Sequence, residues 1–362
     1  MAAGPKAPWG ITPMRRSADR LRRDGLEMWR AGLEAVRADR LVREAFRVEG
    51  TKCLIGHEVL DLETIRQIAV VGAGKAGAAM AAAVEEVLGP ELLEQKQVTG
   101  WLNVPEDCIR PLARIHLHPA RPAQVNEPTA AGVAGSQEIL RIVSSLGPQD
   151  LCLCLISGGG SALLPAPVEP ITLEDKLALT RHFSACGATI NEINTVRKHL
   201  SQIKGGGLAR ACRAGHLVAL IISDVLGDPL DVIASGPTVE DPSTPEAALA
   251  VLEKYDCLAA GISPRVFGYI RAKARQGRRA PTAAQRACRV TNLIIGNNAT
   301  AVNAVGRAAE HLGYVPAVAS ATRPEGYAEA IGQHLAEMAV SMRARAGPDC
   351  LITGGEPVVK LV

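Results

Sequence analysis

The feature that most constrains this chain is a unit that recurs along it: an apolar, β-branched run, a loop of small residues, and then a helical stretch. The unit can be read at five places, residues 68–80, 151–164, 217–228, 292–302 and 351–359. Continuous apolar strands that alternate with helices are typical of a parallel sheet covered on both faces. The sequence therefore predicts an α/β fold.

One of these units, LISGGGSALL at residues 155–164, places three glycines between two serines where a strand should end. A run of glycine costs backbone entropy on folding, so it usually marks the close approach of another group or positive φ angles. A tight turn without a ligand is the alternative. Because ligands of such sheets bind beyond the carboxyl ends of the strands, we expect a binding loop. Its residues are Ser157, Gly158, Gly159, Gly160 and Ser161.

A second loop, GAGKAG at residues 72–77, follows a strand and precedes an alanine-rich stretch, which is the setting of a dinucleotide fingerprint. An acidic residue should then close the next strand to bind a ribose, but QVTGWLNV at residues 97–104 has none. Lys75 stands where a helix begins and where backbone amides favour anions. We expect it to meet a phosphate or carboxylate, with Gly72 and Gly74 beside it. A lysine that only reaches solvent is the alternative.

The segment NEINTVRKHLSQIKGGGLA, residues 191–209, has two stripes at helical spacing. One is an apolar core stripe, and its neighbour is polar and contains no acid: Asn194, Arg197, Ser201 and Lys204. Glycines 205–207 should end the helix. The planar guanidinium of Arg197 can bind a carboxylate or phosphate through two hydrogen bonds. The stripe is therefore predicted to bind an anionic ligand, and a solvated surface is the alternative.

Acidic and polar residues follow three further strands. Asp224 begins the loop SDVLGDPLD, and Asp224 and Asp228 offer hard oxygen ligands for Mg²⁺. Asp224 is equally suited to act as a base toward a hydroxyl, and Asp228 before a proline is also explained as a turn residue. Asn297 and Glu356 repeat the pattern after their own strands.

The composition limits the function classes. A net charge of +3 and 3% aromatic residues argue against nucleic-acid binding, and no apolar run approaches the roughly 18 residues that a membrane span needs. The 9 cysteines include no CxxC pair, which indicates reduced thiols and a cytoplasmic protein.

A basic amphipathic first helix is predicted near the N-terminus, with a mitochondrial presequence as the alternative. A Pro-, Gly- and Arg-bearing stretch indicates a domain boundary near residue 288.

With these motifs in view, the sequence resembles the class II glycerate kinases, whose second domain is of the MOFRL type. The resemblance runs from about residue 30 to the last residue. It is densest in three segments, residues 155–176, 187–209 and 221–238. Motifs of this length are far more specific than a lone GxGxxG.

The resemblance implies two Rossmann-like three-layer α/β domains with a cleft between them, residues 1–288 and an incomplete MOFRL-type domain at 289–362. It also implies ATP-dependent phosphorylation of D-glycerate with Mg²⁺, giving 2-phosphoglycerate in most members and leaving the 3-hydroxyl open here. Lys75 matches the family's catalytic lysine, and Asp224 matches its active-site aspartate. The implied partners are D-glycerate and ATP, with no nucleic acid or membrane, and a homodimer is left open.

Two segments of the family lie outside these 362 residues: one that supplies an essential arginine, Gly-Gly-Arg-Asn-Gln-Glu, and a Gly-Thr-Asp-Gly stretch. Three interpretations therefore stay open. The chain is a glycerate kinase, an NAD(P) oxidoreductase of the hydroxypyruvate reductase type, or a catalytically silent fragment that binds ligand. The lack of a ribose-binding acid and the polar stripe favour the kinase.

Overall fold

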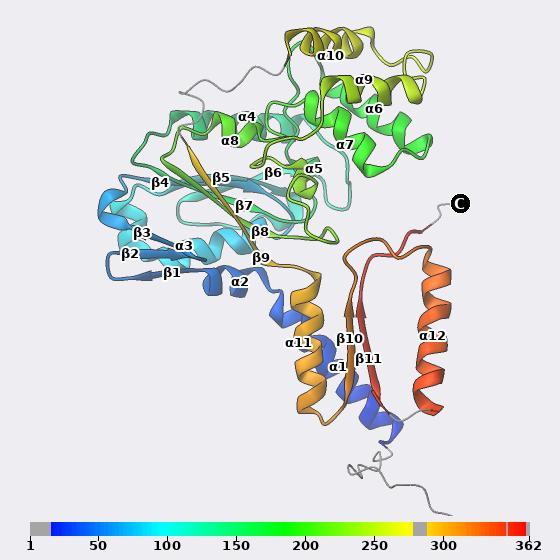
Figure 1. The fold of residues 1–362 in the computed structure, drawn as a ribbon. Helices are drawn as coiled ribbons and strands as arrows, with labels where there is room; N and C mark the ends of the chain where they lie inside the picture. Colours follow the sequence, from blue (N-terminus) through cyan, green and yellow to red (C-terminus); the bar gives the residue numbers. More distant parts are fainter. Residues whose placement is uncertain (1–15, 278–287, 345–346, 360–362) are drawn as a thin grey trace, which may run out of the picture.

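A parallel sheet of six strands forms the centre of the structure, a computed structural model that describes residues 16–277, 288–344 and 347–359 (Figure 1). The strand order is β6-β5-β4-β7-β8-β9. In chain order the strands are β4 (Ile68–Ala73), β5 (Thr99–Pro105), β6 (Ile115–Arg121), β7 (Leu151–Ile156), β8 (His216–Ile222) and β9 (Arg289–Gly296). The predicted α/β fold is confirmed.

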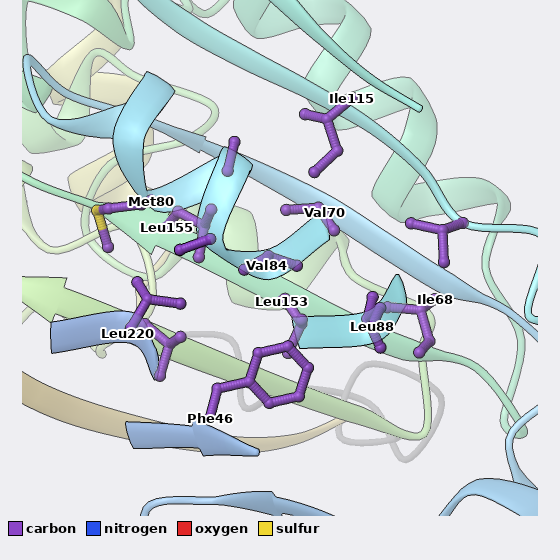
Figure 2. Close-up of a cluster of buried hydrophobic side chains, with 14 of the residues drawn as sticks. Phe46, Ile68, Val70, Met80, Val84, Leu88, Ile115, Leu153, Leu155 and Leu220 are labelled. Atoms are coloured by element: carbon purple, nitrogen blue, oxygen red, sulfur yellow. The ribbon is translucent and has the colours of Figure 1, made fainter. Parts of the chain in front are cut away.

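The sheet is buried on both faces because its central strands are apolar at every position. Ile68 and Val70 of β4 pack on one side against helix α3 (Gly77–Gln95), in the core cluster drawn in Figure 2. Ala69 and Val71, the alternate residues of the same strand, pack on the other side with helix α4 (Ala130–Ser145). This arrangement is why the strands read as continuous apolar runs rather than alternating ones.

A group of four helices lies beside the sheet and has its own core, which includes Phe183, Val196 and Leu252 (Figure 1). The four are α6 (Leu173–Ala185), α7 (Ile190–His199), α9 (Pro245–Lys254) and α10 (Pro264–Gln276). Three short helical segments connect this group to the strands: α5 (Gly160–Leu163), α8 (Gly207–Ala211) and η3 (Ile233–Ser235). Two more lie between strands, η1 (Leu62–Thr64) before β4 and η2 (Glu106–Cys108) after β5.

An antiparallel meander with the order β1-β2-β3 packs against the sheet on the side of α3. Its elements are helix α2 (Ala38–Ala45), which precedes it, β1 (Phe46–Glu49), β2 (Lys52–Ile55) and β3 (Glu58–Asp61). Phe46 is fully buried in the same core cluster as Ile68 and Val70 (Figure 2).

A smaller α/β unit follows the large sheet (Figure 1). It contains the parallel pair β10 (Pro316–Ser320) and β11 (Cys350–Gly354), with helices α11 (Asn298–His311) and α12 (Ala328–Ala344). The first helix, α1 (Ala18–Ala35), belongs to this unit as well, since Met28 packs with Val302 and Asp24 accepts a 2.7 Å hydrogen bond from the Tyr314 hydroxyl.

The division of the chain into domains at residue 288 stays a prediction, but two elements cross it. Strand β9, which begins at Arg289, is hydrogen-bonded to β8 in the large sheet, and α1 packs on α11. Both placements come from tertiary contacts that a local composition change does not reveal. Residues 278–287, immediately before the predicted boundary, lie outside the described residues, as do residues 1–15.

All nine cysteines are free, and Cys152 and Cys154 are buried in β7. Among the residues that the structure describes, no helix combines the length and apolar character that crossing a membrane requires.

Candidate active site

The SGGGS loop lies between an acidic and a basic side chain. A Cβ added to Gly158 would stand 2.4 Å from Oδ2 of Asp224. Gly159 has φ +80°, and a Cβ there would stand 3.4 Å from Cε of Lys75 and 3.1 Å from Nη2 of Arg121. The glycines thus allow these three side chains to approach the loop backbone, which a larger residue would prevent.

The loops after β4 and β7 are fastened to each other. The Lys75 amide donates a 2.9 Å hydrogen bond to the Gly158 carbonyl, and the Ser157 hydroxyl accepts one of 3.0 Å from the Ala76 amide. The Lys75 side chain itself is exposed. These hydrogen bonds fix the backbone of Lys75 and leave the ammonium group at the end of its side chain free to meet a ligand.

The glycines of GAGKAG have a structural cause. A Cβ at Gly72 would lie 1.9 Å from the Leu155 carbonyl oxygen, and one at Gly74 would lie 2.0 Å from Oγ of Ser157. Contact with the neighbouring strand therefore explains both residues without a bound nucleotide, and their role in ATP binding stays a prediction.

Two cavities meet at Asp224. The larger, about 660 Å³, is lined by Ser157, Gly159, Gly160, Ser161, Asn194, Arg197 and Asp224 together with apolar side chains. The second, about 490 Å³, is lined by Asn297, Glu356 and again Asp224. Asp224 is exposed and contributes to both walls. The other predicted site residues are not among those lining either cavity: Gly72, Gly74, Lys75, Gly158, Lys204 and Asp228.

Three basic side chains lie at or behind the wall of the larger cavity without an acidic partner among the described residues. Lys176 and Lys204 are 5% and 1% exposed, and Arg197 is half-buried. Within the described part of the chain, none of the three forms an ion pair. Burial, with the charge of Arg197 as a second cause, lowers the pKa of Lys176 to about 7, and burial lowers the pKa of Arg197. Of the three, Arg197 lines the cavity and keeps its charge, so it favours an anion there.

The prediction that glycines 205–207 end the helix is wrong. Helix α7 ends at His199, six residues before Gly205. The Lys176 ammonium donates a 2.9 Å hydrogen bond to the Leu200 carbonyl, so a buried lysine from α6 satisfies the backbone at this end. Gly205 and Gly206 instead pair through their amides with the carbonyls of Ser235 and Gly236.

Two residues of the polar stripe, Asn194 and Lys204, are nevertheless connected in the structure. Lys204 Nζ lies 2.6 Å from the Ser161 carbonyl oxygen and 3.2 Å from its Oγ. The Ser161 and Ser235 hydroxyls are 2.8 Å apart, and Ser235 donates a 3.1 Å hydrogen bond to Oδ1 of Asn194. Asn194 and Lys204, ten positions apart in the sequence, are thus joined through two serines.

The structure offers fewer residues for the predicted metal site than for the predicted anion site. Asp228 has φ +54° and accepts a 2.5 Å hydrogen bond from Nδ2 of Asn297, which suits a turn residue. Across residues 16–277, 288–344 and 347–359, no group of three or more His, Cys, Asp or Glu side chains could hold a metal ion. Mg²⁺ is commonly held by one or two carboxylates plus substrate phosphates, and the exposed Asp224 fits that mode. Metal binding by Asp224 and Asp228 stays a prediction.

Three residues near the site were missed in the sequence. Arg121 is 4% exposed, ends β6 and faces Gly159, so the strand-end rule that selected the other loops could have found it. Ser235 lies in a Ser-Gly-Pro turn with φ +62°. Lys176 gives no signal, because LEDKLALT reads as an ordinary surface helix.

The argument from a missing ribose acid is weakened by the structure. Strand β5 extends to Pro105, and Glu106 follows it directly. Its Oε1 accepts a 3.2 Å hydrogen bond from the Ala123 amide. An acid therefore does stand at this strand end, two residues beyond the segment searched in the sequence, because the strand is longer than its apolar run.

A parallel sheet covered on both faces, with a glycine-lined cavity at its carboxyl edge, defines an α/β protein of the class that binds ligands at this edge. Residues 24–271 match the family model described as "Domain of unknown function (DUF4147)". The chain is 34% identical to a protein of Bos taurus named "Glycerate kinase", covering 100% of this chain and 77% of that protein. The chain belongs to the glycerate kinase family that carries this domain.

Two further comparisons bear on function. A protein of Agrobacterium vitis named "Putative hydroxypyruvate reductase" is 40% identical, covering 81% of this chain and 64% of that one. The crystal structure of a Thermotoga maritima protein titled "Glycerate kinase (EC 2.7.1.31)" has a TM-score of 0.72 and 31% identity, covering 95% of this chain and 76% of that one. The chain thus spans about two thirds to three quarters of the length of these relatives.

Proposed function

We propose that this chain binds D-glycerate and ATP at the carboxyl edge of its large sheet and transfers the γ-phosphoryl group to a glycerate hydroxyl. The observation that carries the proposal is that Lys75 and Asp224 both lie against the SGGGS loop, and that Asp224 also lines the larger cavity together with Arg197. Phosphoryl transfer is catalysed mainly by positioning and by offsetting charge, for which these groups are suited.

In this proposal Lys75 offsets the negative charge that develops on the transferring phosphoryl group. Asp224 accepts the proton of the attacking hydroxyl or contributes to holding Mg²⁺ with the phosphates of ATP. Arg197 contacts an anionic group of one of the two substrates. The 2-hydroxyl of D-glycerate is the proposed acceptor.

The two cavities supply room for two substrates. Their shared wall at Asp224 would bring a hydroxyl in one cavity next to a phosphate in the other, as in-line transfer requires. Asn297 and Glu356, on the wall of the second cavity, would then contact the substrate that does not touch Arg197.

The proposal also covers the cellular location, the oligomeric state and a second candidate function. Nine free thiols are typical of a reducing compartment, which supports a cytoplasmic location. A homodimer stays a prediction. Hydroxypyruvate reduction is the second candidate, and it is supported by the name of the Agrobacterium vitis relative and by Glu106 at the end of β5.

The two candidates are separated by one pair of assays on the same preparation. ADP formation from ATP–Mg²⁺ is followed with and without D-glycerate, and NADH oxidation is followed with hydroxypyruvate. Added enolase consumes 2-phosphoglycerate directly and so identifies the acceptor hydroxyl. We expect glycerate-dependent ADP and 2-phosphoglycerate in equal amounts. NADH oxidation by hydroxypyruvate without any glycerate-dependent ADP would establish the reductase instead.

A further inference from the structure

An arginine at the end of β6 lies against the SGGGS loop. Arg121 is the last residue of that strand and is 4% exposed. Its Nη2 would stand 3.1 Å from a Cβ added to Gly159, a residue that lines the larger cavity. Cε and Cγ of Lys75 would stand 3.4 and 3.5 Å from the same Cβ. Two basic side chains, one at the carboxyl end of β6 and one just after β4, therefore converge on one glycine.

The guanidinium of Arg121 is held by one of its three nitrogens. Nη1 donates to the Val125 carbonyl and, at 2.7 Å, to Oδ1 of Asn126. Nε is buried and has no hydrogen-bond partner among the residues that the structure describes, and Nη2 forms no hydrogen bond to them either. The bonds from Nη1 therefore orient the group and leave the edge that carries Nε and Nη2 without a partner in this part of the chain.

The free edge is the one with which other arginines of this protein hold a carboxylate. Nε and Nη2 of Arg66 donate to the two oxygens of Asp150 at 2.9 and 2.7 Å. Nε and Nη2 of Arg181 donate in the same way to Glu127. Two parallel hydrogen bonds of this kind suit the oxygens of a carboxylate or a phosphate. The free edge of Arg121 is therefore able to hold an anion that the described residues do not supply.

The charge of Arg121 is not neutralised by an ion pair. A guanidinium keeps its proton in proteins. Burial lowers the pKa of Arg121 and the charge of Asp107 raises it, but no carboxylate in the described part of the chain lies within ion-pair distance. A buried cation without an acidic partner is costly. Because Lys75 reaches the same glycine, an anion placed there would stabilise both charges.

We propose that Arg121 and Lys75 together bind a phosphate group against Gly159, with Nε and Nη2 of Arg121 donating to its oxygens. A terminal phosphate has three acceptor oxygens and about two negative charges, which is enough for both side chains. The two oxygens of a carboxylate would be filled by the arginine alone. Identifying this phosphate as part of ATP rests on the proposed kinase function, whereas the phosphate site itself does not.

The test titrates the full 362-residue chain with inorganic tripolyphosphate, and separately with D-glycerate, by calorimetry. Arg121→Met keeps most of the aliphatic stem and removes the guanidinium. It should weaken tripolyphosphate binding roughly 10- to 150-fold, the usual cost of losing a hydrogen bond to a charged group, and leave D-glycerate binding unchanged. Arg114→Met, which changes an exposed arginine just before the same strand, is the matched control and should bind like the native chain.

A second variant separates phosphate binding from a structural role. Asn126→Ala removes one of the two acceptors of Nη1, so it disturbs the loop that Arg121 holds and leaves the guanidinium in place. We expect this variant to keep an affinity for tripolyphosphate close to the native value. Tripolyphosphate binding by a native chain that forms no glycerate-dependent ADP would contradict the kinase function and still support this site.

Four results would overturn the proposal. They are a native chain that does not bind tripolyphosphate, a folded Arg121→Met variant with native affinity for it, an equal loss in Asn126→Ala, and a loss limited to D-glycerate. Folding is judged by the thermal midpoint. A crystal structure of the native chain with tripolyphosphate needs no variant: a phosphate oxygen should lie within about 3.2 Å of Nε or Nη2 of Arg121. Phosphate bound only elsewhere would also overturn the proposal.

Discussion

The two edges of the large sheet use charge differently. At the amino edge, Asp150 lies just before β7, has a fully buried side chain and forms an ion pair of 2.7 Å with Arg66. Arg289 at the start of β9 forms an ion pair of 2.8 Å with Glu58. At the carboxyl edge, Arg197 and its buried neighbours Lys176 and Lys204 have no acidic partner among the described residues. The ion pairs at the amino edge are satisfied by the fold. At the carboxyl edge Lys176 and Lys204 donate to backbone carbonyls, whereas Arg197 lines the large cavity and is available to a ligand.

The largest expected effect concerns Asp224. If it accepts the proton of the attacking hydroxyl, Asp224→Asn should lower turnover by roughly 10²-fold or more. The dependence of turnover on Mg²⁺ should change as well if the carboxylate contacts the metal. Steady-state rates with ATP, D-glycerate and Mg²⁺ varied separately check this. Turnover equal to the native value at every Mg²⁺ concentration would make Asp224 only a loop residue.

The next effect concerns Lys75. Lys75→Met should lower turnover by roughly 10²-fold, the scale of removing one preorganised electrostatic contact. Since the side chain is exposed, the free energy of unfolding should hardly change. Lys52→Met, in the β1–β3 meander, removes an exposed lysine far from the site and is the control. A folded Lys75→Met with near-native turnover would show that this lysine only meets solvent.

A smaller effect is expected for ligand affinity. Arg197→Ala should weaken binding of D-glycerate or ATP by roughly 10- to 150-fold, the usual cost of losing a charged hydrogen bond of about 1.5–3 kcal/mol. Arg181→Ala is a matched control, because Arg181 lines the same cavity but is already paired with Glu127 at 2.9 Å. Calorimetric titration of each ligand measures both. Equal losses in the two variants would contradict the distinction between paired and unpartnered cations.

At the amino edge the effect should fall on stability instead. Asp150→Ala removes the acceptor for Arg66, Gln67 and the Gly147 amide, and should lower the free energy of unfolding by about 1.5–3 kcal/mol. Turnover per folded molecule should stay at the native level. Urea denaturation together with an activity assay checks this. A variant with native stability and reduced turnover would contradict the assignment of the amino edge to stability and not to function.

The last effect is a pH dependence of the free energy of unfolding from Lys176, which has no bearing on turnover. The unfolded chain keeps the lysine protonated up to its usual pKa of 10.5, whereas the folded chain releases the proton at about 7. The unfolded state therefore binds more protons in this window, and the free energy of unfolding rises with pH by about 1.4 kcal/mol per unit. Lys176→Met lacks this contribution, so native minus variant stability should rise between pH 7 and about 9. A flat difference would contradict the assignment.

The fold could be predicted where the burial of an element is visible in the sequence of that element alone. Residues 68–73 and 151–156 are apolar at each position because both sheet faces are covered, and the sequence reports this directly. The packing of α1 on α11 and of β9 on β8 could not be predicted, since each joins segments whose own patterns fit either unit.

The site was predictable to a similar extent. The SGGGS loop, Asn194, Arg197 and Asp224 were selected by strand ends and helical spacing, and all of them except Gly158 line one cavity. Lys176 was missed because its burial is caused by α7, a separate helix, and nothing in its own segment distinguishes it from a solvated lysine. Ser235 was missed because its role depends on a hydrogen bond to Ser161, 74 positions away.

The difference between the two edges is tested most directly by the unfolding free energy of Arg197→Met with and without ATP–Mg²⁺ and D-glycerate. This variant keeps most of the aliphatic packing of the side chain and removes the guanidinium with its charge and its hydrogen-bond donors. We predict that it is at least as stable as the native chain without ligand, because an unpartnered cation is removed, and that it loses most of the stabilisation that saturating ligand gives the native chain. A variant that is less stable without ligand yet fully stabilised by ligand would contradict the account.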